Sequence, residues 1–269
     1  MSTGHFRRTP GRAGRPEARH RKRRLGTPRV AGFLALAAAL GLYYAFHQSL
    51  WSASTWWSIA FLAFVLIPAV FGLVYLALPL WRSPVRQLLL LAIAFGLVAL
   101  VFELAGASAP GDFAKLGAMT MVGWLFLRYF EEASWVVLVA CIVPWVDAYS
   151  VWRGPTHEIV HHRQHVFSTL SFSFPVPGSN DAAKLGLPDL LFFALFLGAA
   201  ARFELRVPWT WLCLTASIGA TMALATLFDV GGLPALPLLS LGFLLPNADL
   251  LWRAVRTSRA ARDRRPSPK

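Results

Sequence analysis

The chain has 269 residues, of which 56% are hydrophobic and only 14% are charged, whereas charged residues make up about a quarter of a typical soluble protein. This composition argues against a water-soluble domain and favours a protein embedded in a membrane. The net charge of +13 would suit nucleic acid, but the basic residues are concentrated at the two ends of the chain. There they match the anionic headgroups of membrane lipid, so we expect no nucleic-acid partner.

Apolar runs recur from position 30 to position 252. Runs of about 18 to 25 residues are long enough to cross a hydrocarbon core of about 30 Å as helices. Because the bilayer offers no water to backbone groups, such runs must be helical. The sequence therefore predicts an all-α, polytopic transmembrane bundle of about eight helices. The expected spans, in chain order, are 30–48, 55–80, 85–106, 114–130, 133–152, 186–204, 207–228 and 233–252.

Lys and Arg in the connections between these spans predict the orientation, because positive charge is retained on the cytoplasmic side. With the amino terminus inside, the inner connections carry Arg82, Arg86, Arg128, Arg202 and Arg206, and the outer ones carry Lys115, Arg153, Arg163 and Lys184. This bias, with an even number of spans, places the basic tails 1–29 and 253–269 in the cytoplasm. The connection 153–185 is then expected outside the plasma membrane. It lies in the second half of the transmembrane domain (133–252), which follows the first group of helices (30–130).

The connection 153–185 is the longest, and we expect a short surface helix followed by an irregular segment. It contains His157-Glu158-Ile-Val-His161, which fits the His-Glu-x-x-His signature of zinc metalloproteases. On a helix the two imidazoles share a face and can bind Zn²⁺ while the glutamate polarises its water. A third ligand would come from His165, Asp181 or Asp189. Because the run continues as a polar, solvent-facing segment, we keep the zinc site as an alternative and expect no cofactor.

Two aspartates are predicted at membrane depth. Asp147 lies about 14 residues, or roughly 21 Å, along its helix from the inner end, and Asp189 lies a few residues into the next helix, which returns from the outer side. An ionisable group in lipid costs about 3 kcal/mol on insertion scales, so it is normally turned inward and paired or hydrated. Two carboxylates brought close in a low dielectric hold one proton between them. One can then act as a base towards water and the other as an acid towards a peptide carbonyl. Hydrogen bonding to neighbouring helices is the structural alternative.

Three short motifs accompany these aspartates. Gly154-Pro155 follows the first, Lys184-Leu-Gly-Leu-Pro-Asp189 contains the second, and Pro234-Ala-Leu236 precedes the last span. These segments resemble the presenilin and signal peptide peptidase family of intramembrane aspartyl proteases. That family has a Gly-Pro pair after its first catalytic aspartate, a Gly-x-Gly-Asp motif around the second, and a Pro-Ala-Leu motif at its last helix. The resemblance covers about residues 133–252, and Pro188 stands where the family motif has its second glycine.

The resemblance implies a presenilin-like fold and an activity. The chain would hydrolyse peptide bonds within transmembrane segments or signal peptides, with Asp147 and Asp189 as the catalytic pair. Its partners would be transmembrane proteins or peptides and membrane lipid. A catalytically inactive presenilin-like scaffold or helix-binding protein is the alternative. The residues that the resemblance implies for shaping the site and binding substrate are Gly186, Leu187, Pro188, Pro234, Ala235 and Leu236.

Overall fold

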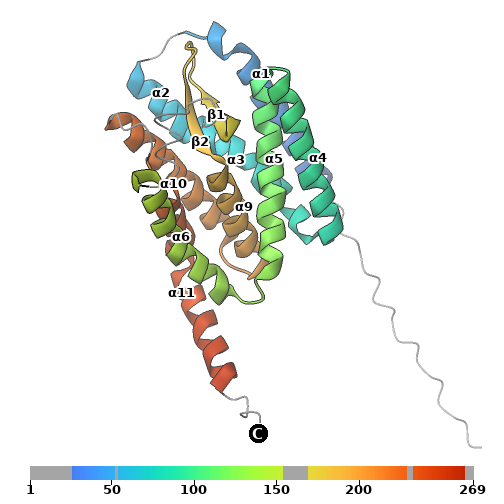
Figure 1. Ribbon diagram of the computed structural model, residues 1–269, viewed down its shortest axis with the longest axis vertical. Coiled ribbons are helices and arrows are strands. Elements are labelled where there is room, and N and C mark those ends of the chain that lie inside the picture. Colours follow the sequence, from blue (N-terminus) through green and yellow to red (C-terminus); the bar gives the residue numbers. More distant parts are fainter. Residues whose placement is uncertain (1–25, 52–53, 154–168, 229–232, 264–269) are drawn as a thin grey trace, which may run out of the picture.

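The computed structural model describes residues 26–51, 54–153, 169–228 and 233–263, which form an up-and-down helical bundle with a small β-hairpin at one end (Figure 1). Within these ranges there are eight helical segments, as the sequence predicts. They are α1 (Thr27–Phe46); α2 (Thr55–Phe61), which continues through a π-helical turn (Leu62–Leu66) into α3 (Ile67–Ala77); α4 (Val85–Leu104); α5 (Ser108–Phe126); α6 (Ala133–Arg153); α9 (Leu187–Arg202); α10 (Val207–Leu227); and α11 (Leu236–Asp263). Short 3₁₀ turns follow α1, α3 and α5, at His47–Ser49, Leu78–Arg82 and Leu127–Tyr129.

Six of the described helices are long and apolar enough to cross a membrane: Thr27–Ser49, Thr55–Arg82, Val85–Leu104, Ala133–Ser150, Val207–Leu227 and Leu236–Arg256. The predicted spans 114–130 and 186–204 correspond to α5 and α9, which are not among the six. Buried side chains lie along most of the length of both helices. The other helices, rather than lipid, therefore cover α5 and α9.

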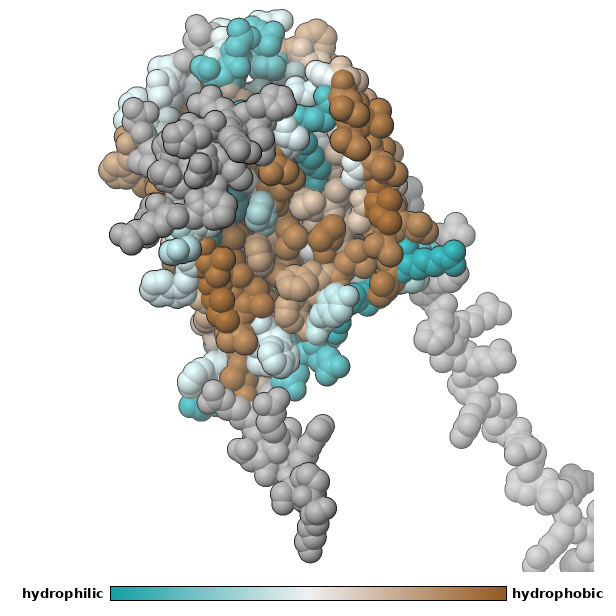
Figure 2. All heavy atoms as spheres, viewed as in Figure 1, coloured by the Kyte–Doolittle hydropathy of each residue, from teal (hydrophilic) through white to brown (hydrophobic). Residues whose placement is uncertain are grey.

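The outer surface of the bundle is apolar. Leu90, Leu97 and Val101 on α4 are each more than half exposed. Figure 2 shows such side chains over the middle of one face, with polar side chains towards its two ends. A band of exposed apolar side chains between polar ends is the surface that a bilayer requires.

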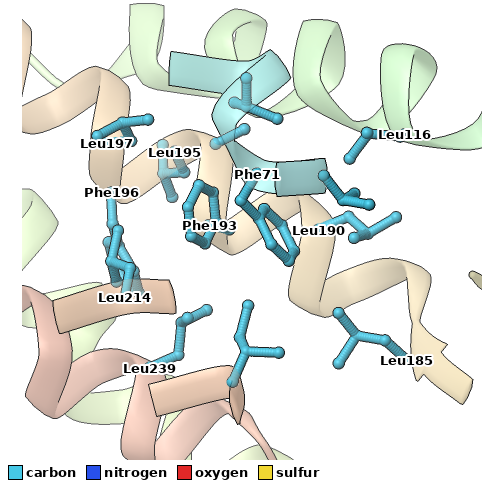
Figure 3. Close-up of a cluster of buried hydrophobic side chains, with 14 of the residues drawn as sticks. Phe71, Leu116, Leu185, Leu190, Phe193, Leu195, Phe196, Leu197, Leu214 and Leu239 are labelled. Carbon is cyan, nitrogen blue, oxygen red and sulfur yellow. The ribbon is translucent and has the colours of Figure 1, made fainter. Parts of the chain in front are cut away.

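The core is built around α9. Phe193 packs against Phe71 of α3, with ring centroids 4.1 Å apart, and Phe196 stacks on Phe243 of α11 at 4.9 Å. Figure 3 shows Phe71, Phe193 and Phe196 in this cluster. All four rings are fully buried. The packing fixes the position of α9, at whose start Asp189 lies.

A β-hairpin occupies the place where the sequence predicts an irregular segment, so that prediction is wrong. Strand β1 (Ser171–Pro175) pairs antiparallel with β2 (Ala182–Gly186). Alternate residues Phe172 and Phe174 are fully buried, as the two-residue period of a strand requires. The turn contains Gly178 with a φ of 68°, a backbone conformation that glycine adopts without steric cost. The predicted surface helix falls on residues 154–168, outside the described residues.

At the end of the bundle opposite the hairpin, Asn247 joins α11 to the start of α10. Its side chain is fully buried. It donates to Thr210 Oγ1 (2.8 Å) and to the carbonyl of Phe243 (2.9 Å), and it accepts from the amide of Arg206 (3.0 Å). The guanidinium of Arg206 also binds Asp249 at 2.8 Å.

The last helix ends later than the predicted span. α11 continues to Asp263, so the first part of the basic tail predicted for 253–269 is helical and not extended chain. Alanine and arginine, which dominate this stretch, are among the strongest helix formers and do not need lipid to stay helical.

Candidate functional site

Asp147 lies towards the hairpin end of α6, and its carboxylate is bound to the start of α11. The backbone N–H of Leu236 donates to Asp147 Oδ2 at 3.0 Å. The first N–H groups of a helix have no partner within the helix, and they form the positive end of its dipole. The next residue, Pro237, has no N–H to satisfy. The start of α11 therefore offers the Asp147 carboxylate a hydrogen bond and the positive end of a helix dipole.

Asp189 is the third residue of α9 and turns back towards the residue before the helix. Its carboxylate has a hydrogen bond with the backbone of Gly186, which is the arrangement of an acidic side chain at the third position of a helix. A Cβ on Gly186 would lie 3.3 Å from Asp189 Oδ2. A larger residue at position 186 would consequently press on the carboxylate and change its direction.

The two carboxylates are close enough for the charge of Asp147 to repel that of Asp189. Both lie at the hairpin end of the bundle, both are partly exposed, and each is bound by a backbone group at the start of a helix. Helices α6 and α9, which carry them, are separated in sequence by the connection and the hairpin. The arrangement therefore brings two carboxyl groups within electrostatic reach of each other, each beside the start of a helix, whose positive end favours negative charge.

The other residues expected to shape the site lie around this pair. Pro188 is exposed in the first turn of α9, where a missing N–H costs no hydrogen bond. The amide of Leu187 donates to the carbonyl of Leu170 at 3.2 Å and so continues the strand pairing into the helix. Ala235 and Leu236 are buried and Pro234 is partly buried. The Pro-Ala-Leu segment therefore packs inside the bundle and presents one amide to Asp147.

Strand β2 leads directly into the site and has a free edge. In an antiparallel pair, successive residues direct their N–H and C=O groups alternately towards and away from the partner strand. The bonds from Val176 N to Asp181 O and from Leu187 N to Leu170 O flank the ladder and set this alternation. The groups that point away from β1 are those of Ala182, Lys184 and Gly186. Within the described residues β2 pairs only with β1, and because the N–H of Gly186 is bound to Asp189, the open part of this edge is formed by Ala182 and Lys184.

A buried ionic cluster that the sequence did not predict lies beside the hairpin. Lys115 was predicted in an outer connection, but it lies within α5 and is 8% exposed. Its ammonium binds Glu103 at 3.0 Å and Asp112 at 3.2 Å, and Asp112 is 3% exposed. The prediction is wrong because α5 begins at Ser108, earlier than the expected span. The pairing of Asp112 with Lys115, three residues apart on one helix, was visible in the sequence as a signal.

Most candidate ligands of the alternative zinc site lie outside the residues that the structure describes. His157, Glu158, His161 and His165 lie outside the described residues, and Asp181 is engaged with Ser179 in the hairpin turn. In the described ranges, no three His, Cys, Asp or Glu side chains gather where they could hold a metal ion.

Comparison with known proteins leaves the family open. No protein-family model matches the sequence, and no curated protein matches it significantly.

Proposed function

We propose that the chain is an intramembrane aspartyl protease in which Asp147 and Asp189 share the catalytic proton. The observation that carries the proposal is the hydrogen bond from Leu236 to Asp147, with Asp189 within electrostatic reach. It joins the Pro-Ala-Leu segment to one aspartate, and the Leu-Gly-Leu-Pro-Asp segment supplies the other. Two of the three motifs that resemble the presenilin and signal peptide peptidase family therefore lie beside the aspartates, and the third, Gly154-Pro155, lies outside the described residues.

The reaction needs no group beyond these two carboxyls and water. The ionised carboxylate takes a proton from water, the water oxygen bonds to the peptide carbonyl carbon, and the protonated carboxyl gives its proton to the carbonyl oxygen. The resulting diol then returns one hydroxyl proton to the second carboxylate. The first carboxyl protonates the amide nitrogen, and the C–N bond breaks. The pair ends with one proton, as it began.

The free edge of β2 offers a place for the substrate backbone. A transmembrane helix keeps its amides in internal hydrogen bonds, so its peptide bonds must unwind before water can reach them. An unwound segment can recover its lost hydrogen bonds by pairing with an exposed strand edge. Ala182 and Lys184 present such groups, and the strand ends beside Asp189. Substrates would be transmembrane segments or signal peptides lying in the same lipid.

We place the protein in the plasma membrane with both termini in the cytoplasm and the hairpin end outside. The amide of Gly178 in the hairpin turn donates to the carbonyl of His47, just after α1. A helix of 20 residues is about 30 Å long, so α1 begins at the opposite end, where α11 also ends (Figure 1). The basic residues of both tails support the cytoplasm as the location of that end.

A catalytically silent, helix-binding relative is the second candidate, and Pro188 is the observation that favours it. The residue before Asp189 lies exposed beside the carboxylate and has no N–H to offer a substrate. Such a protein would bind transmembrane peptides without cleaving them.

A cleavage assay separates these candidates. The full chain, reconstituted in lipid vesicles, would be given a model transmembrane peptide, with and without a metal chelator, and the products would be identified by mass spectrometry. We expect cleavage by the wild-type protein that the chelator leaves unchanged. Cleavage that the chelator abolishes would assign the activity to a metal site. Cleavage only after Pro188→Gly, with binding by the wild type, would identify the silent relative.

A further inference from the structure

The outer edge of β1 is closed by side chains from two helices. The residues that face away from β2 are Ser171, Ser173 and Pro175, and four of their backbone groups are bound. Lys115 donates to Ser171 O (3.4 Å), Ser173 N donates to Asp112 Oδ2 (3.1 Å), Tyr44 donates to Ser173 O (2.8 Å), and Tyr43 donates to Pro175 O (2.8 Å). No further strand can add to this edge, in contrast to the edge of β2.

Two of these contacts come from the buried ionic cluster. Asp112 and Lys115 bind each other as well as the strand, and Glu103 on α4 holds the ammonium from another side. Burying charges is costly, and an ion pair at such a position rarely stabilises a protein more than apolar side chains would. Overall stability is therefore a poor explanation for this cluster. What it does provide is a pair of directional bonds to one strand.

The hairpin needs such an anchor. An isolated two-stranded hairpin is only marginally stable in water, and β2 has no strand on its other side within the described residues. Cross-strand pairs Ser171–Gly186 and Ser173–Lys184 connect the anchored residues directly to the end of β2. A displacement of β1 would reach Gly186, whose backbone is bound to Asp189.

We propose that Asp112 and Lys115 are positioning residues, which hold β1 so that β2 and the Asp189 carboxylate keep a fixed geometry while only the edge of β2 stays open. The proposal rests on the protease function for its catalytic consequence. Its structural half, that these two side chains hold the hairpin, can be measured without any substrate.

A matched pair of double variants isolates the bond to the strand. Asp112→Leu/Lys115→Met and Asp112→Asn/Lys115→Met remove the same two charges and leave Glu103 equally without its partner, so the loss of that ion pair cancels when the two variants are compared. Only the variant with Asn retains an oxygen that can accept from Ser173 N. In hydrogen–deuterium exchange on the reconstituted full chain, we expect amides of 171–175 to exchange about tenfold faster in the Leu variant than in the Asn variant, the upper range for one lost hydrogen bond. Exchange in α9 should stay within about twofold, because the effect is local.

The same two variants are then compared in peptide cleavage. Because the hairpin positions Asp189, we expect a lower kcat in the Leu variant at similar KM. The kcat of the Asn variant should lie between those of the Leu variant and the wild type. Equal exchange of the hairpin in the two variants would overturn the proposal. Faster exchange in the Leu variant with an unchanged kcat would overturn the claim that the hairpin positions Asp189 for catalysis. If the wild type cleaves nothing, the protease function fails, and the exchange data alone decide whether Asp112 holds the strand, while the Asn variant compared with the wild type tests Lys115.

Discussion

The close approach of α5 to α9 gives the sharpest stability prediction. Gly123 on α5 is buried, and a Cβ there would lie 2.6 Å from the carbonyl oxygen of Leu191 and 3.1 Å from Cβ of Ala194, both on α9. Ordinary carbon–oxygen contacts lie at about 3.3 Å, so Gly123→Ala must separate the two helices by roughly 0.7 Å at this point. Overpacking of this kind costs about 1–3 kcal/mol.

Gly96 on α4 provides the control, because it is exposed and a Cβ there would meet nothing within 4 Å. Both substitutions gain about 0.5–1 kcal/mol from the lower backbone entropy of alanine, so their difference isolates the packing cost. We expect Gly123→Ala to be about 1–3 kcal/mol less stable than Gly96→Ala. Thermal unfolding in detergent, followed by fluorescence of the 11 tryptophans, measures this. Equal unfolding temperatures would refute the predicted contact between α5 and α9.

Two further pairs of substitutions test the polar contacts at the two ends of the bundle. Asn247→Leu leaves the amide of Arg206 without its acceptor and should lower the free energy of unfolding by about 1–3 kcal/mol, whereas Asp249→Asn, which breaks an exposed ion pair, should have a much smaller effect. Similar losses in thermal unfolding would contradict this ranking. Asp147→Leu removes the acceptor for Leu236 N and should be about 1 kcal/mol less stable than Asp147→Asn, which keeps one. A Leu variant as stable as the Asn variant in the same assay would show that the hydrogen bond contributes nothing.

The helical bundle could be predicted from the sequence because apolar runs of this length are stable in a membrane only as helices. Helices α4 (Val85–Leu104) and α10 (Val207–Leu227) nearly coincide with the predicted spans 85–106 and 207–228. The placement of Asp147 and Asp189 followed from counting along two helices that run in opposite directions. Positions along a helix are fixed by its rise per residue, so this inference needed no tertiary information.

The hairpin could not be predicted in the same way. Its apolar alternation covers only Phe172 and Phe174, and Pro175 argues against a strand because proline cannot donate to a ladder. The structure resolves this conflict, since Pro175 faces the outer edge of β1, where no ladder bond is lost, and its carbonyl accepts from Tyr43. This contact joins residues 132 positions apart, which no local pattern encodes.

The ionic cluster beside the hairpin was missed for a related reason. Asp112 and Lys115 were visible as a local pair, but their bonds to Ser173 and Ser171 span 61 and 56 residues. A lysine near the expected end of an apolar run normally lies in the connection between two membrane spans, where its charge is exposed to water. Only the early start of α5 and the docked hairpin turn it into a buried group.

The most direct test of the central claim is the cleavage rate of a model transmembrane peptide by Asp147→Asn, Asp189→Asn and the double variant. Asparagine keeps the shape of each side chain and can still accept the bond from Leu236, so only the shared proton is lost. Residues that act as one catalytic unit lose as much activity singly as together. We predict that all three variants cleave at the background rate. Substantial cleavage by either single variant would contradict the account.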